Sequence, residues 1–206
     1  MKKILSSPLL TAIFAFAIGI ITFIVFGKAS GITGMAIYAQ LIAWLHVIVG
    51  ITWIGLLYYF NFVQVPAVGQ ALADEGGPGP AGINKYVAPK ALFWFRWAAL
   101  ATWITGLSAL ENIHGPAGSG VIAAFTFQQG FVLIGMGAWL GTIMLFNVWM
   151  IIWPNQRKIL GLNPEAASAD EIAKAKVWAL MASRTNTVLS IPLLFAMTGY
   201  GHGLAI

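Results

Sequence analysis

The chain has 206 residues, of which 59% are hydrophobic and only 8% charged. A water-soluble globule carries about 25% charged residues, so the excess apolar surface predicts contact with a lipid bilayer. The absence of cysteine excludes disulfides, Cys-ligated zinc, iron–sulfur clusters and covalently attached c-type haem in this chain. The net charge of +5 lies in short loops, which favours a topological signal, and we expect no nucleic-acid partner.

Five apolar runs are long enough to cross about 30 Å of hydrocarbon as helices. We therefore predict an all-α fold, a polytopic transmembrane helix bundle of about five spans that forms a single domain over residues 1–206. Pro66 and Pro154 are predicted to end the second and fourth spans. Ser168 and Glu171 have capping-box spacing, which predicts a helix that leads into the fifth span. The predicted spans are residues 8–26, 37–65, 91–110, 121–153 and 178–200.

The first run follows Lys2 and Lys3, as in a secretory signal, but it is longer than a typical signal core. We expect a retained first helix, with a cleaved signal as the alternative. With a cytoplasmic N-terminus, every Lys and Arg except Lys28 falls on the cytoplasmic side. This bias predicts a multi-pass protein of the bacterial cytoplasmic (inner) membrane with a periplasmic C-terminus.

His46 lies inside an apolar helix, and Gly50 lies one turn away on the same face. An ionisable residue at membrane depth suggests function, and neutral imidazole is a good ligand for haem iron or copper. Gly50 leaves room for a flat macrocycle or for a neighbouring helix. A histidine that only hydrogen-bonds to another helix is the alternative. Residues alone leave both interpretations open, with b-type haem as the expected cofactor.

A metal site would need further ligands, and the predicted outer half of the bundle holds the candidates. Glu111 and His114 have a spacing that places both on one helical face, and His202 lies between glycines near the C-terminus. Copper or another metal held by His46, His114, His202 and Glu111 is therefore the alternative to haem. His114 or His202 would also serve as the second axial ligand of a haem. The competing interpretation treats His114 and His202 as solvated loop residues.

Polar residues also gather in the predicted inner half. Arg96 and Arg184 could bind an anionic substrate or a haem propionate through their guanidinium groups, or serve only as topological anchors that reach the headgroups. Asn61, Asn147 and Asn186 would add hydrogen-bonding groups to such a site. His46 and the arginines lie in opposite halves of the membrane in this interpretation.

Three stretches carry a resemblance to a known family. They are residues 46–64 (HVIVGITWIGLLYYFNFVQ), 147–156 (NVWMIIWPNQ) and 184–195 (RTNTVLSIPLLF). Together they resemble the membrane domain at the N-terminus of bacterial cytochrome-linked urate oxidases (urate hydroxylases), over about residues 38–200. The opening of the first stretch is also similar to other small membrane proteins that hold b-type haem.

The resemblance implies an oxidoreductase that oxidises urate or a related small molecule. Family members with this activity carry a C-terminal c-type cytochrome, whereas this chain has no cysteine to attach one. A separate c-type cytochrome or a respiratory complex would then accept the electrons. Two other functions stay open: a non-catalytic membrane subunit, and a small transporter. The oligomeric state is also open, and whether the chain is an enzyme at all rests on the resemblance.

Overall fold

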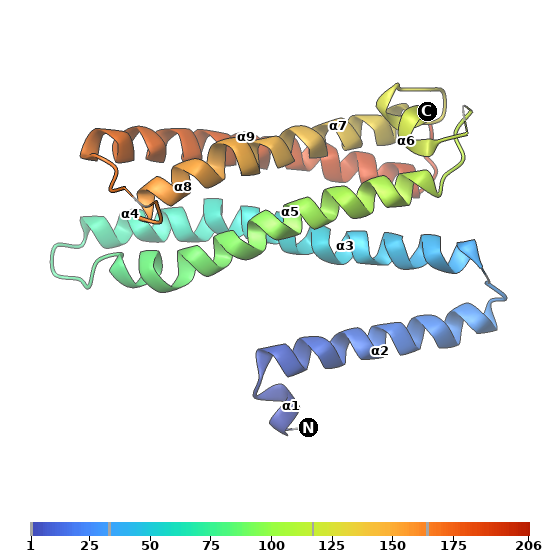
Figure 1. Cartoon of the computed structure of the whole chain (residues 1–206), viewed down its shortest axis with the longest axis horizontal. Coiled ribbons are helices and arrows are strands. Elements are labelled where there is room, and N and C mark those ends of the chain that lie inside the picture. Colours follow the sequence, from blue (N-terminus) through green and yellow to red (C-terminus); the bar gives the residue numbers. More distant parts are fainter. Residues whose placement is uncertain (1, 33, 117, 164) are drawn as a thin grey trace. The chain divides into compact units, whose positions relative to one another are not determined.

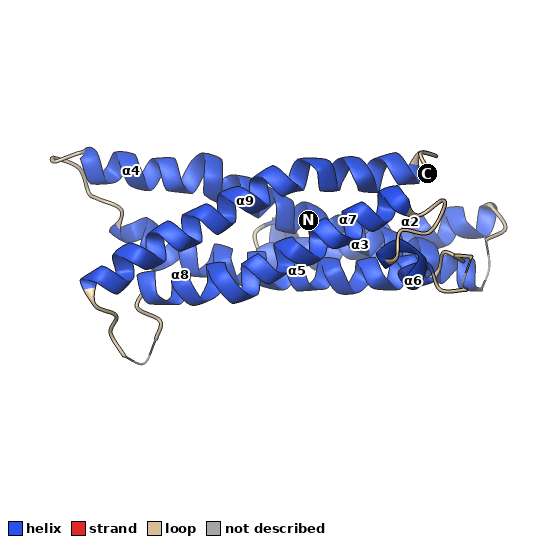
Figure 2. Cartoon of the chain, turned by 90° about the horizontal axis from the view of Figure 1, so that it is seen from above, coloured by secondary structure: helices blue, strands red, loops and turns tan. Residues whose placement is uncertain are grey.

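Helices form every regular element in the described part of the chain, which is residues 2–32, 34–116, 118–163 and 165–206 of this computed structural model (Figure 2). The all-α prediction is confirmed for these residues. The chain divides into Met1–Ile42 and Ala43–Ile206, and each unit is described by itself. In chain order the elements are α1 Lys2–Leu5, α2 Pro8–Ala29, α3 Met35–Tyr59, η1 Phe60–Gln64, α4 Val65–Ala73, η2 Ile83–Val87, α5 Ala88–Glu111, α6 Gly120–Phe125, α7 Val132–Phe146, η3 Asn147–Ile152, α8 Trp153–Ile159 and α9 Ala169–Gly201.

The first unit is dominated by α2. Its start is fixed by the Ser7 side chain, which accepts from the Leu10 backbone N–H at 3.4 Å, and by Pro8 at the first helical position. Its 22 residues correspond to about 33 Å of helix, and apolar side chains lie on every face. A helix that is apolar all round belongs in lipid or in a core, which fits the predicted first span.

Three π-helical segments each stand immediately before a proline. η1 precedes Val65-Pro66, η2 precedes Ala88-Pro89, and η3 precedes Trp153-Pro154. Proline lacks an N–H and its ring crowds the carbonyl four residues back. The π segments shift the bonding by one residue (the N–H of Val65 donates to the Phe60 carbonyl), and the helix continues past the proline. The prediction that Pro66 and Pro154 end their spans is therefore wrong: helix runs on to Ala73 and to Ile159.

The predicted span 121–153 also starts in the wrong place. α6 ends at Phe125, and the chain turns before α7 begins at Val132. Phe127 and Gly130 both have positive φ, at 53° and 82°, which a continuous right-handed helix does not allow. The break falls at residues 126–130 (TFQQG), whose polar residues and glycine are a turn signal that the predicted span passed over.

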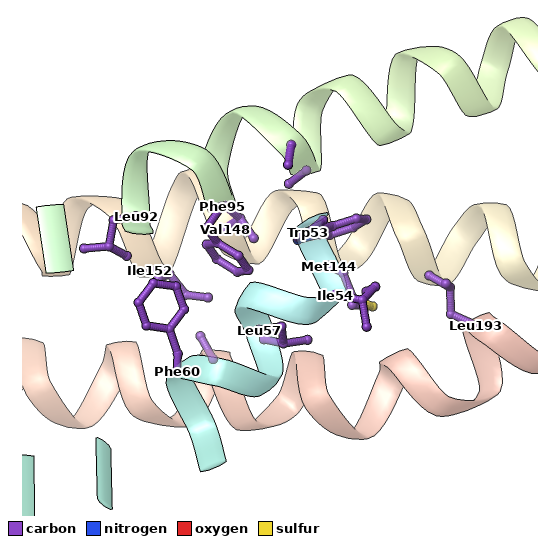
Figure 3. Packing of buried hydrophobic residues seen from close by; sticks show 13 residues of the cluster. Trp53, Ile54, Leu57, Phe60, Leu92, Phe95, Met144, Val148, Ile152 and Leu193 are labelled. Atoms are coloured by element: carbon purple, nitrogen blue, oxygen red, sulfur yellow. The ribbon is translucent and has the colours of Figure 1, made fainter. Parts of the chain in front are cut away.

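The core of the second unit lies where four helical segments meet (Figure 3). Trp53 and Leu57 of α3, Phe95 of α5, and Met144 of α7 are at most 2% exposed. α9 closes the bundle along α7 and α8, and Figure 1 shows these helices side by side. A second, smaller core cluster holds Leu110, Ala123, Ala124, Phe131 and Ile134.

The two ends of this unit differ in their number of Lys and Arg residues. One end holds the loop after α4 and the starts of α5 and α9, and we name it the basic end. The opposite end, named the far end, holds α6 and the C-terminus (Figure 1). The basic end carries Lys85, Lys90, Arg157, Lys158, Lys174 and Lys176.

Among the described residues, three helical stretches are long and apolar enough to cross a membrane: Pro8–Ala29, Met35–Ala73 and Val132–Ile159. They correspond to the first, second and fourth predicted spans. α5 and α9 are long enough by length, at 24 and 33 residues. Their charged residues and many small side chains make them less apolar.

Candidate functional site

His46 joins α3 to α5 at the centre of the candidate site. Its Nδ1 lies 2.9 Å from the Thr102 carbonyl oxygen and 3.2 Å from Thr105 Oγ1. A carbonyl oxygen can only accept, so Nδ1 must carry the hydrogen and donate it. Thr105 Oγ1 donates its own hydrogen to the Ala101 carbonyl at 2.7 Å or to the Thr102 carbonyl at 3.1 Å. Its lone pairs are therefore free to accept from His46 Nδ1.

This contact fixes the tautomer of the neutral imidazole. With the hydrogen on Nδ1, the other ring nitrogen, Nε2, keeps its lone pair. No described residue donates a hydrogen bond to Nε2. Histidines that ligate metals commonly donate the second ring N–H to a backbone carbonyl in this way. The residues present therefore fit a haem iron or another metal ligated through Nε2.

The glycines around His46 differ in what they contact. Gly106 of α5 lies against the imidazole, and a Cβ there would come within 3.0 Å of His46 Cε1. Gly50 faces α5 as expected, but a Cβ there would meet only Thr102 Cγ2 at an ordinary 3.8 Å. Gly55, expected on the sequence to face a neighbouring helix or cofactor, has open space around its Cβ position and is exposed, so no helix of the second unit packs closely on it, and the cofactor part of the expectation stays a prediction. The close glycine is Gly106, which the sequence did not single out.

The other metal candidates lie at the far end. His114 is exposed, and Glu111 accepts a hydrogen bond from Ser119 Oγ at 2.7 Å. His202 is also exposed and donates from Nδ1 to the Thr198 carbonyl at 2.7 Å. From Thr102 to Glu111 the helix rises about 13 Å. No three His, Cys, Asp or Glu residues in the described ranges form a metal-binding group, so the structure does not bring His46, His114, His202 and Glu111 together.

The predicted asparagines do gather, along one face of α9. Asn186 is fully buried, donates to the Met144 carbonyl at 3.0 Å, and accepts from Asn147 Nδ2 at 2.8 Å. Asn61 donates to Ser183 Oγ at 2.8 Å and to the Leu57 carbonyl at 2.9 Å. Its Oδ1 is buried and has no hydrogen-bond partner.

A hydroxyl pair extends this face. Ser190 Oγ donates to the Thr187 carbonyl at 2.7 Å, so the Tyr58 hydroxyl, 2.9 Å away, must donate to Ser190. From His46 to Asn61 the helix rises about 22 Å, so Asn61 cannot touch a group bound at His46 Nε2. The polar face of α9 therefore holds helices together at a distance from His46.

The two arginines have different surroundings. Arg96 stacks on three indoles, with its Cζ 3.7 Å from the ring centre of Trp153 and 5.2 Å from that of Trp149. Arg184 is exposed, and no described residue forms an ion pair with it or hydrogen-bonds to its side chain. The structure thus does not join Arg96 and Arg184 into one pocket.

Residues 117–205 match the profile of a family described as urate oxidase N-terminal. The match covers less than half of the chain, and over that part the chain is similar to this family. It includes the stretches that begin at Asn147 and Arg184, whereas the stretch that begins at His46 lies outside it. No curated protein and no solved structure matches the chain.

Proposed function

We propose that this chain is a membrane redox protein that binds b-type haem through His46 Nε2. The observation that carries the proposal is the hydrogen bond from His46 Nδ1 to the Thr102 carbonyl, which leaves Nε2 as a free ligand. A b-type haem held there would supply a one-electron redox centre. Thr102 and Thr105 would orient the imidazole of His46. Gly106 has no side chain, which leaves room for this imidazole against α5.

The substrate part of the proposal rests on similarity. The match of residues 117–205, together with the resemblance of residues 46–64, favours oxidation of urate or a related small molecule. A separate c-type cytochrome or a respiratory complex would take the electrons. Fold-level and family-level likeness supports an activity less strongly than it supports a fold. The experiment below therefore addresses the cofactor first.

We also propose five spans, with α5 and α9 crossing the membrane beside the three apolar stretches. The basic end would lie in the cytoplasm of a bacterium and the far end in the periplasm, as the positive-inside rule requires. The chain lacks cysteine, so a single Gly203→Cys variant gives an unambiguous label. An impermeant thiol reagent should modify it in intact spheroplasts. Modification only after the membrane is opened would reverse the orientation.

An absorption spectrum of the purified protein, oxidised and then reduced, tests the cofactor. We expect a reducible haem band at one haem per chain. His46→Ala should lose it, and His202→Ala, which changes an exposed histidine with the same Nδ1–carbonyl contact, should keep it. Haem that persists in folded His46→Ala protein would assign the iron to another residue.

A second candidate function follows from the same contact. His46 links α3 to α5 through its own hydrogen bonds, as a packing histidine in a non-catalytic subunit of a membrane complex would. A folded parent protein without any haem band, even after growth with added haem precursor, would establish this alternative and refute the redox proposal.

A further inference from the structure

Arg96 lies in an aromatic cage near the basic end. Its guanidinium stacks directly on Trp153, and Trp149 and Trp97 enclose it at 5.2 and 5.7 Å from Cζ to the ring centres. Trp97 and Trp149 themselves meet edge to face at 5.4 Å. Stacking of this kind holds a guanidinium in one orientation. Arg96 is therefore a fixed positive group rather than a freely moving anchor.

This cage has donors and positive charge but no acceptor. Arg96 Nε and Nη1 are buried without a hydrogen-bond partner, and so is Trp149 Nε1. Nη2 is the guanidinium nitrogen that stays accessible. No carboxylate of the described residues pairs with Arg96, and the neighbouring Arg157 of α8 repels it. Two cations without a counter-ion at the edge of a membrane are costly, and an anion would relieve that cost.

An apolar groove begins at the same place. It runs between α5 and the α7–η3 segment, with Leu100 and Trp103 on one wall and Phe146, Trp149 and Met150 on the other. Leu100 and Trp103 lie one and two turns from Arg96, toward the far end. Trp103 Nε1 donates to Thr142 Oγ1 at 2.9 Å, so these two polar groups of the groove satisfy each other, whereas Trp149 Nε1 stays unpaired. Phe146 and Met150 are 58% and 62% exposed, so the groove opens outward.

We propose that Arg96, Arg157 and this groove form a binding site for an anionic phospholipid. The phosphate would contact Arg96 Nη2 and Arg157, and one acyl chain would lie along Leu100, Trp103 and Met150. Trp149 belongs to both the cage and the groove, so the charged and apolar parts are continuous. A small anion would contact only the cage around Arg96, whereas an amphiphile would contact the cage and the apolar groove. Basic pockets between membrane helices at the cytoplasmic side bind acidic headgroups by this chemistry. The site is independent of His46 and of the proposed redox activity.

Native mass spectrometry of the delipidated full chain in detergent tests the proposal. Dioleoyl phosphatidylglycerol and dioleoyl phosphatidylethanolamine are added separately at matched concentrations. We expect one phosphatidylglycerol to bind about tenfold more tightly than phosphatidylethanolamine, and Arg96→Gln to abolish that preference. Arg184→Gln removes the same charge from an exposed position and should change binding by less than about twofold. Met150→Ser should weaken phosphatidylglycerol about threefold without any change of charge.

Three results would overturn the proposal. Equal losses in Arg96→Gln and Arg184→Gln would reduce the effect to general surface charge. Equal binding of the two lipids would show a groove with no headgroup recognition. Competition by glycerol 3-phosphate as strong as that by the intact lipid would show a site for free phosphate. If Arg96→Gln does not fold, Arg157→Gln replaces it, with the same expected loss of preference.

Discussion

Two regions of α5 differ in whether their polar side chains have hydrogen-bond partners. Around Thr102 and Thr105, every hydrogen that His46 Nδ1 and the threonines offer finds an acceptor. About 9 Å toward the basic end, Arg96 keeps two buried N–H groups without a partner. The first region needs nothing further to be stable except at His46 Nε2. The second keeps donors that no described residue satisfies.

The difference separates two uses of polarity in a membrane bundle. Satisfied groups tie helices together and are worth about 0.6 kcal/mol each on average. Unsatisfied groups lower stability, so each one needs an explanation such as a ligand, an ion or a bound water. The predictions below test whether satisfied and unsatisfied positions respond differently to substitution, beginning with the largest expected effect.

Gly106→Leu should have the largest effect. A side chain there would drive into the His46 imidazole, since even a Cβ would lie 3.0 Å from Cε1. Overpacking of this kind should lower the free energy of unfolding by up to about 3 kcal/mol and remove bound haem. Thermal unfolding in detergent and haem stoichiometry are the two measurements. Gly55→Leu is the matched control, because Gly55 has open space, and its stability should stay at the parent value.

Asn186→Leu should follow. The substitution leaves Asn147 Nδ2 without its partner and removes one of the two hydrogen bonds to the Met144 carbonyl, which should cost about 2 kcal/mol. Asn61→Leu also breaks two hydrogen bonds, but it removes the unpaired Oδ1, so we expect about 0.5 kcal/mol. Chemical unfolding measured side by side would compare them. Equal costs would mean that the unpaired Oδ1 has a partner such as bound water.

A pair of tryptophans gives a smaller contrast. Trp103→Phe removes the hydrogen bond to Thr142 and should cost about 0.6 kcal/mol beyond the loss of ring area. Trp149→Phe removes an Nε1 that has no partner. The delipidated variant should therefore lose only the stability that comes from the smaller ring area. The unfolding temperatures of the two variants provide the measurement. A larger loss in Trp149→Phe than in Trp103→Phe would contradict the assignment of Trp149 as unsatisfied.

The smallest effect concerns the exposed start of α9, where water competes with every contact. Backbone and side-chain hydrogen bonds from Ser168 lower the pKa of Glu171 below its ordinary value. A lowered folded pKa means that the contribution to stability is present above the ordinary value and is lost as pH falls through the lowered one. Carbon-13 shifts of the Glu171 carboxyl against pH should show this lowered midpoint. Ser168→Ala removes only the hydroxyl and keeps the backbone N–H, so it should raise the midpoint part of the way, and an unchanged midpoint would contradict a contribution from the hydroxyl.

Much of the fold could be predicted from the sequence. The apolar runs locate the helices, and Ser168 with Glu171 marks the start of α9, where both capping-box hydrogen bonds form. The expectation failed at backbone features that composition does not encode. Pro66 and Pro154 lie within continuing helices because a π segment precedes each of them. The turn between α6 and α7 lies at residues 126–130 (TFQQG), where Phe127 and Gly130 have positive φ, and the predicted span passed over this polar segment.

The candidate site was predicted less completely. His46 was identifiable as an ionisable residue in an apolar helix. Its partner is a backbone carbonyl of Thr102, and no sequence pattern reveals which carbonyl a distant helix will present. Gly106 became significant only once α3 and α5 were placed together. The cage around Arg96 left a weak signal, since Trp149 and Trp153 are four residues apart and share one helical face.

The π segments also affect how this protein can change in evolution. Each π turn holds one residue more than an α turn, so the helix beyond it is rotated by about 100° relative to an unbroken α-helix. Loss of a single residue from η3 would turn Trp153 and Arg157 away from Arg96 while hardly altering the length of the helix. The number of residues between Phe146 and Pro154 should therefore be constrained as strongly as their identity. Substitutions in this segment should be tolerated where single-residue deletions are not.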